Sequence, residues 1–218
     1  MKVPACRDEV LRRYPKLICQ GDRSLLLGQL AAVIGTRDPS PQALKNTQMI
    51  VSALCSEGFT VVSGLALGVD SAAHKAALRY GRTIAVVPFG PDCPCYPPSN
   101  EELYETIRKR NLVIHPFGPD EGTSKWTLAA RSRLIAEISD VVFLVEGSEE
   151  GGGRRAADHA LCCGRPVVLP KSFYSTAVSE WRRPLPEGRP YALPGSTMAG
   201  FPDLVCIRRV IPVQGELF

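Results

Sequence analysis

The chain has 218 residues, of which 44% are hydrophobic and 22% are charged, as is typical of a globular protein and not of a disordered one. Twenty-six Lys and Arg residues against 22 Asp and Glu residues give a net charge of +4, a weak indication of a polyanionic ligand. No apolar run approaches the roughly 18 residues of a membrane span, and the N-terminus shows no apolar signal core. We therefore expect a cytoplasmic protein without a membrane anchor.

The chain contains eight cysteines but no Cys-x-x-Cys pair. Only three histidines, His74, His115 and His159, accompany them, and no zinc-ligand spacing repeats along the chain. The cysteine pattern predicts reduced, mostly buried thiols of a cytosolic protein. We expect neither a metal site nor any other cofactor.

Six short apolar runs alternate with amphipathic stretches of helical length. The expected strands are 30–35, 59–64, 83–88, 111–117, 141–146 and 166–170. The expected helices between them are 40–57, 70–80, 100–110, 127–139 and 154–163. Strands that are apolar on both faces need helices on both sides and right-handed crossovers between them. The sequence therefore predicts the α/β class, with a doubly wound, mostly parallel six-stranded sheet of the Rossmann-like type.

Two flanks fall outside this alternation. Residues 1–29 are expected to form an N-terminal lead-in with a short helix near 8–14, before a Rossmann-like domain over 30–170. Residues 171–218 are rich in Pro and Arg, and we expect them to be a short irregular extension with an edge strand within 204–210. Such a segment is too short for a core of its own, so it should pack on the sheet or on a second subunit.

The candidate ligand site lies beyond the carboxyl ends of the strands, where open parallel sheets bind their ligands. Glycines let a phosphate approach the backbone, N–H groups at a helix start attract anions, and Arg or Lys side chains bind phosphate oxygens. No catalytic residue is expected among these positions. The candidate phosphate-binding residues are Gly35, Thr36, Arg37, Ser63, Gly64, Lys125, Arg131, Arg133, Gly152, Gly153 and Arg154.

An aromatic residue, Trp126, stands among the basic residues of the 125–133 segment. Cationic side chains beside an aromatic ring are typical of single-stranded nucleic-acid sites, where charge binds phosphates and the ring stacks on a base. The alternative is a solvated basic helix end in which Trp126 anchors packing. The chain has neither a GxGxxG after its first strand nor a GxxxxGK[ST] motif, which argues against a dinucleotide cofactor and a P-loop ATPase.

The segment VVSGLALGVDSAAHKAAL at 61–78 resembles the SGxAxGID and AAH signature of the DNA-processing protein A (DprA/Smf) family. The resemblance continues in the same order over about 14–170 and includes AVIGTRDPSP at 32–41 and SKWTLAARSRLIAEIS at 124–139. It implies a Rossmann-like domain that binds single-stranded DNA in a positive pocket. It also implies a homodimer and assistance in loading a RecA-type recombinase during DNA uptake and recombination.

Other functions remain open. GGGRRAAD at 151–158 also lies in register with the GGxGTxxE motif of the related LOG-type phosphoribohydrolases, which cleave nucleoside monophosphates. Asp158 stands in place of the catalytic glutamate and is one methylene shorter, which displaces the carboxylate. One alternative is thus a nucleotide-binding sensor or phosphoribohydrolase that uses the same pocket. Another is a structural protein whose Pro- and Arg-rich tail docks on a partner.

Overall fold

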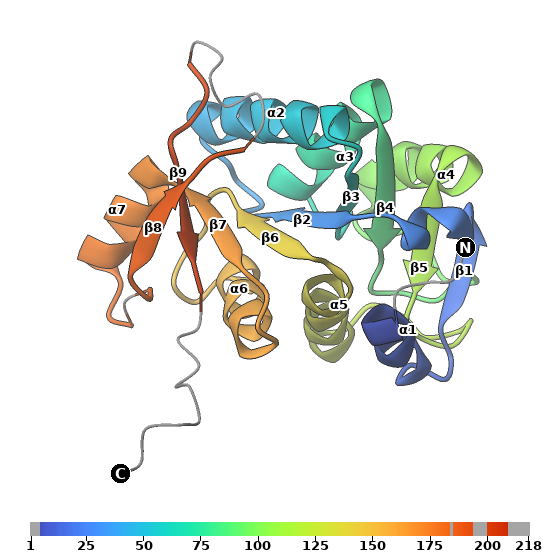
Figure 1. Ribbon diagram of the computed structural model, residues 1–218. Helices are drawn as coiled ribbons and strands as arrows, with labels where there is room; N and C mark the ends of the chain where they lie inside the picture. The colour runs from blue at the N-terminus through green and yellow to red at the C-terminus, as the bar shows by residue number, and fades with distance from the viewer. Residues whose placement is uncertain (1–4, 184, 194–199, 209–218) are drawn as a thin grey trace.

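The computed structural model describes residues 5–183, 185–193 and 200–208. Within these ranges one nine-stranded sheet has the order β1-β5-β4-β3-β2-β6-β7-β9-β8 (Figure 1). Its six inner strands are all parallel, which confirms the predicted strands and the Rossmann-like class. These strands are β2 (Leu30–Ile34), β3 (Thr60–Ser63), β4 (Arg82–Val86), β5 (Leu112–His115), β6 (Val141–Leu144) and β7 (Val167–Pro170).

Helices cover both faces of the sheet, as strands that are apolar on both sides require (Figure 1). One face carries α2 (Pro41–Ser56), α3 (Val69–Tyr80) and α4 (Glu101–Arg110). The other face carries α1 (Ala5–Arg12), α5 (Lys125–Ile138), α6 (Gly152–Cys162) and α7 (Lys171–Glu180). Two short 3-10 helices, η1 (Arg23–Leu27) and η2 (Pro98–Asn100), lie in the connections. In the described parts of the chain, no helix has both the length and the apolar character to cross a lipid bilayer.

The N-terminal flank joins the sheet directly. Its helix, α1, begins three residues before the predicted 8–14 segment, and residues 1–4 lie outside the described ranges. The lead-in also contains a strand that the sequence did not predict, β1 (Ile18–Gly21), which pairs antiparallel with β5. β1 therefore covers the edge that β5 would otherwise expose to other chains.

The C-terminal flank is not irregular where it is described. The strand expected within 204–210 is β9 (Leu204–Ile207), but it is not at the edge, because β8 (Gly188–Tyr191) pairs with its outer side. Buried Leu204, Val205 and Ile207 side chains explain why β9 packs against β7. Parts of the predicted extension lie outside the described ranges, namely residues 184, 194–199 and 209–218. The last two residues of the predicted strand segment 204–210 are among them.

The cysteines are free thiols in the described part of the chain, where five of seven are partly buried and two are exposed. The expectation that most are buried is therefore wrong. The two exposed thiols, Cys162 and Cys163, are neighbours at the end of α6. Cys162 also lines the cleft described below.

A buried arginine ties α1 to the rest of the molecule. Only 2% of Arg7 is exposed, and its Nε donates to the Ile138 carbonyl at 2.8 Å. Nη1 donates to the carbonyls of Leu26 (2.6 Å) and Gly28 (2.9 Å), and Nη2 lies 2.9 Å from a carboxylate oxygen of Asp140. The single guanidinium thus links α1, η1, the end of α5 and the start of β6.

We expect Arg7→Ala to lower the free energy of unfolding by about 3 kcal/mol or more, because it leaves buried carbonyls and a carboxylate without their donor. Arg12→Ala on the same helix is the control. Arg12 pairs with Asp8 but its side chain is 78% exposed, so its loss should change stability by about 0.5 kcal/mol at most. Urea denaturation of both variants measures the difference, and equal stability of the two would contradict this role of Arg7.

Candidate functional site

The strand order reverses between β2 and β6. The chain proceeds from β2 to β3 on one side, whereas β6 lies on the other side of β2. The loops that follow β2 and β6 therefore diverge, and a crevice opens beyond their carboxyl ends. A cleft of about 1010 Å³ lies here, lined by the loop after β2, the loop after β6, the first turn of α6 and α5.

At Gly35 the loop after β2 passes too close to its neighbours for a side chain. A Cβ on Gly35 would lie 2.7 Å from Cγ2 of Val69 and 2.8 Å from the Glu146 carbonyl oxygen. The N–H of Thr36 donates to that same carbonyl (2.8 Å), and the Thr36 carbonyl accepts from the N–H of Val69 (3.1 Å). These contacts hold the backbone of the loop between α3 and β6. As a result, Arg37 lines the crevice.

The first turn of α6 presents its backbone to the cleft. The helix has Gly151 as its N-cap, with no hydrogen bond from a capping side chain, and Gly151, Gly152 and Gly153 all line the cleft. A Cβ on Gly153 would lie 2.9 Å from Cδ1 of Leu144, whereas a Cβ on Gly152 would meet nothing within 4 Å. Free N–H groups and the positive end of the helix dipole make such a terminus attractive to anions.

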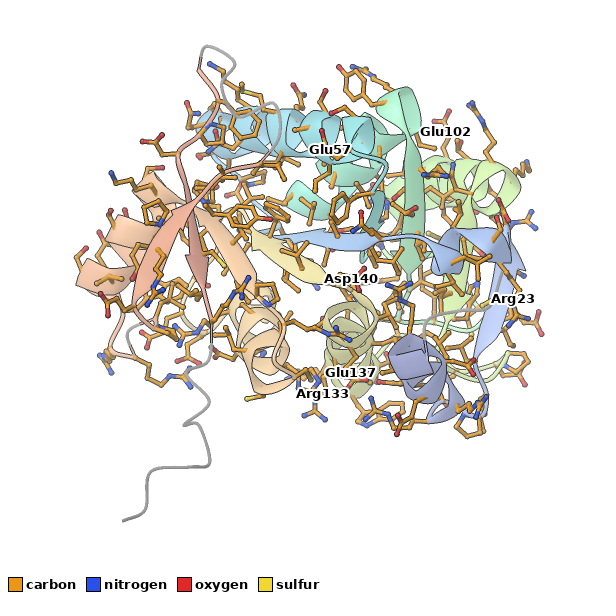
Figure 2. All side chains as sticks on the ribbon, viewed as in Figure 1. Arg23, Glu57, Glu102, Arg133, Glu137 and Asp140 are labelled. Carbon is orange, nitrogen blue, oxygen red and sulfur yellow. The ribbon has the colours of Figure 1, made fainter. Side chains whose placement is uncertain are left out.

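Cationic side chains surround this backbone. Arg37, Lys125 and Arg133 are exposed and form no ion pair with any described residue, so their charges are available to a ligand. Figure 2 shows Arg133 on α5 with its side chain directed away from the sheet. The complete set of cationic residues that line the cleft is Arg37, Lys125, Arg131, Arg133 and Arg155.

Arg131 lies at the floor of the cleft and is buried with Asp70. Its Nη1 is 3.4 Å from Oδ2 of Asp70, which also accepts from the N–H groups of Gly64 (3.2 Å) and Ala66 (3.4 Å). Burial raises the pKa of the Asp70 carboxyl, while burial and the nearby charge of Arg37 lower the pKa of Arg131. The buried Nε of Arg131 has no hydrogen-bond partner among the described residues, so one donor remains for a ligand.

Eight of the eleven predicted site residues line this one cleft, and their binding of phosphate remains a prediction. The structure does not bring Ser63 and Gly64 to its surface. Ser63 is fully buried, and its hydroxyl donates to the Val33 carbonyl at 2.7 Å. A Cβ on Gly64 would lie 1.0 Å from Nη1 of Arg131, so this glycine makes room for the guanidinium. The eight that line the cleft are Gly35, Thr36, Arg37, Lys125, Arg131, Arg133, Gly152 and Gly153.

Arg154 also faces away from the cleft, and its neighbour Arg155 lines it. The Nε of Arg154 donates to Oδ1 of Asp158 at 2.7 Å, and its Nη1 donates to the Arg183 carbonyl at 2.9 Å. Its guanidinium lies 4.9 Å from the ring centroid of Trp181. Arg154 thus fastens the segment after α7 to α6, and its spacing of four residues from Asp158 is a signal for this ion pair. Arg155 is exposed and lines the cleft, although it is not among the eleven predicted site residues.

The Asp158 carboxylate is the group that a phosphoribohydrolase would need in this cleft. Asp158 lines the cleft, but one of its oxygens is engaged by Arg154, whose side chain is only 6% exposed. A general acid or base must approach the reacting atom within hydrogen-bond distance. The geometry therefore favours a structural role for this carboxylate over glycosidic cleavage.

The Rossmann-like sheet defines an α/β protein, and the cationic cleft at its switch point is a candidate site for anionic ligands. A sequence model of the DNA recombination-mediator protein A family matches residues 2–183. The chain belongs to this family.

Among curated relatives, the DNA processing protein DprA of Bacillus subtilis is 32% identical over 72% of this chain and 54% of its own length. DprA of Streptococcus pneumoniae is 36% identical over 72% of this chain and 56% of its own length. The chain thus spans about half the length of these relatives.

Two solved structures share the fold. DprA from Streptococcus pneumoniae has a TM-score of 0.66 at 37% identity and matches 69% of this chain and 53% of that chain. DprA from Helicobacter pylori, whose structure concerns its single-stranded DNA binding mode, has a TM-score of 0.69 at 32% identity over 77% of both chains. The similarity confirms the DprA/Smf resemblance inferred from the sequence.

We expect Gly64→Ala to destabilise the protein by about 3 kcal/mol, because the new methyl group would displace the guanidinium of Arg131 from its buried partner Asp70. Gly152→Ala adds the same methyl group where nothing lies within 4 Å, so it should leave the unfolding transition nearly unchanged. Thermal unfolding compares the two variants. If Gly64→Ala is as stable as Gly152→Ala, the assigned packing of Arg131 is wrong.

Proposed function

We propose that this chain binds single-stranded DNA in the switch-point cleft and serves in DNA processing. The observation that carries the proposal is the set of unpaired cations, Arg37, Lys125 and Arg133, around the uncapped start of α6. DNA phosphates are recognised by Arg and Lys side chains and by the N–H groups of helix N-termini. The Helicobacter pylori relative, which covers 77% of this chain, supports the choice of single-stranded DNA as the ligand.

The proposed contacts divide between charge and backbone. Gly35, Thr36, Gly152 and Gly153 bring main-chain groups to the phosphates, and Arg37, Lys125 and Arg133 supply charge from the rim. Arg131 reaches the same cleft from below, where its unpartnered Nε–H can donate to a phosphate oxygen. Most of the affinity is then electrostatic, and binding has little dependence on base sequence.

Trp126 does not line the cleft itself but adjoins Lys125, which does, and we propose that its ring stacks on a base. It follows Lys125 in the first turn of α5, and 64% of its surface is exposed. One part of the ring packs against Phe117, at a centroid distance of 5.2 Å, which fixes its orientation. Stacking on an exposed aromatic ring contributes about 1–3 kcal/mol per base without selecting among bases. Trp126 thus serves both as a packing residue and as a stacking surface.

The proposal extends to the partners that the family resemblance implies. The chain acts without catalysis, forms a homodimer and assists a RecA-type recombinase on single-stranded DNA in the cytoplasm. The engagement of Asp158 by Arg154 supports the absence of glycosidic cleavage. The free thiols of the described residues are consistent with a reducing compartment.

We expect Arg37→Ala to weaken binding of a fluorescent oligo-dT by about 1–3 kcal/mol, because it removes an unpaired charge from the rim of the cleft. The slope of log affinity against log salt should fall by about 0.7, which corresponds to one phosphate contact on a single strand. Fluorescence anisotropy at several salt concentrations measures both quantities.

Arg23→Ala is the matched control for this titration. Arg23 is exposed like Arg37, but it lies beside β1 and does not line the cleft (Figure 2). Arg23→Ala lowers the net charge of the chain by the same amount as Arg37→Ala, so any general effect of charge on DNA binding appears in both variants. Equal loss of affinity in the two variants, or negligible binding by the unmodified chain, would overturn the proposed DNA site.

A further inference from the structure

A second cluster of polar side chains lies beside the cleft, between the ends of α5 and α6. Cys163 follows α6 directly, one helical turn after His159, and Glu137 lies in the last turn of α5. Oε1 of Glu137 is 2.9 Å from Nε2 of His159, and Sγ of Cys163 is 3.6 Å from the same nitrogen. All three atoms lie within 4.8 Å of one another. Three ligand atoms of different types thus converge between two helices.

The three ligand types and their spacing suit zinc. Thiolate, imidazole and carboxylate are its common ligands, whereas Mg²⁺ and Ca²⁺ take oxygen ligands. Tetrahedral bonds of about 2.0–2.3 Å would place the nitrogen and sulfur ligands about 3.6 Å apart and the oxygen and nitrogen ligands about 3.4 Å apart. The observed nitrogen–sulfur separation of 3.6 Å already fits, and the oxygen–nitrogen separation of 2.9 Å needs to widen by about 0.5 Å.

The carboxylate of Glu137 is held in place by residues other than the ligands. Its Oε2 accepts from Arg13 (3.0 Å) and lies 3.5 Å from the Tyr14 hydroxyl, which leaves Oε1 directed at His159. Burial, followed by the charge of Glu137, raises the pKa of Tyr14 to about 12, so this hydroxyl remains a donor. Such outer contacts orient metal ligands and tune their basicity. Figure 2 shows Glu137 on α5, on the face of the sheet opposite α2.

The positive charge of the nearby Arg13 side chain does not prevent a cation from binding at this cluster. The Arg13 side chain is 58% exposed, so water screens its charge. Arg165 donates to the main-chain carbonyl of Glu137 at 3.3 Å. A divalent cation binds a cysteine as its thiolate and releases the thiol proton, so coordination of Cys163 would not need a free thiolate beforehand.

We propose that Glu137, His159 and Cys163 form a binding site for one zinc ion, with the fourth coordination position open to solvent. The expectation of no metal site came from the absence of paired Cys-x-x-Cys motifs, whereas here the ligands come from two different helices. Only the i, i+4 spacing of His159 and Cys163 is visible in the sequence. His159 and Cys162, three residues further along the chain, also line the cleft. A bound ion would therefore add positive charge at the edge of the cleft. The site itself does not depend on DNA binding.

The test uses Co²⁺ as a spectroscopic probe for zinc on the full chain, after removal of metal with a chelator. We expect saturable binding of one Co²⁺ per chain, a thiolate-to-cobalt absorption band, and loss of the band on addition of Zn²⁺. Cys163→Ser should abolish the band and weaken binding by at least about 100-fold, since loss of an outer-shell partner alone reduces metal affinity about 10–100-fold.

Cys162→Ser is the matched control, because Cys162 is the adjacent exposed thiol and is not part of the cluster. It should retain both the band and the affinity. Both cysteines are exposed, so neither substitution should disturb folding, which circular dichroism verifies. The proposal is wrong if the unmodified chain gives no saturable thiolate band, or if Cys162→Ser and Cys163→Ser have the same effect. Retention of the band after His159→Asn would also overturn it.

Discussion

The close approach of three chain segments at Gly35 is the constraint on which the site depends. Here the end of β2 passes between Val69 of α3 and the carbonyl of Glu146 after β6, with no space for a Cβ. Gly153 lets the first turn of α6 pack against the same loop, because a Cβ at this position would lie 3.5 Å from the Cα of Gly35. Because these contacts fix the backbone on both sides of the switch point, the cleft exists before any ligand arrives. The backbone of the cleft therefore needs little reorganisation on binding.

The six inner strands and β9 are predictable from the sequence, whereas the outer strands β1 and β8 are not. The six apolar runs are buried on both faces, so their pattern alone indicates parallel strands covered by helices. β1 and β8 contain polar or exposed residues, such as Gln20 and Arg189, and show no apolar run. Their pairing is decided by the free edges of the sheet, which only the assembled fold creates. Irregular structure was therefore the wrong expectation for the extension.

The site could be predicted as a region but not side chain by side chain. Strand-end glycines and basic residues identify the cleft, because the topology of a parallel sheet gathers them at one edge. The direction of each side chain depends on partners distant in sequence: Gly64 accommodates Arg131, and Arg154 is captured by the chain after α7. The proposed zinc ligands were missed for the same reason, since Glu137 meets His159 only when α5 packs on α6.

A crystal structure of this chain with a short oligo-dT would show whether single-stranded DNA enters the switch-point cleft. We expect phosphates in the cleft, within hydrogen-bond distance of the N–H groups at the start of α6 and of the Arg37 guanidinium. An oligonucleotide bound on another face, with the switch-point cleft vacant, would contradict this expectation.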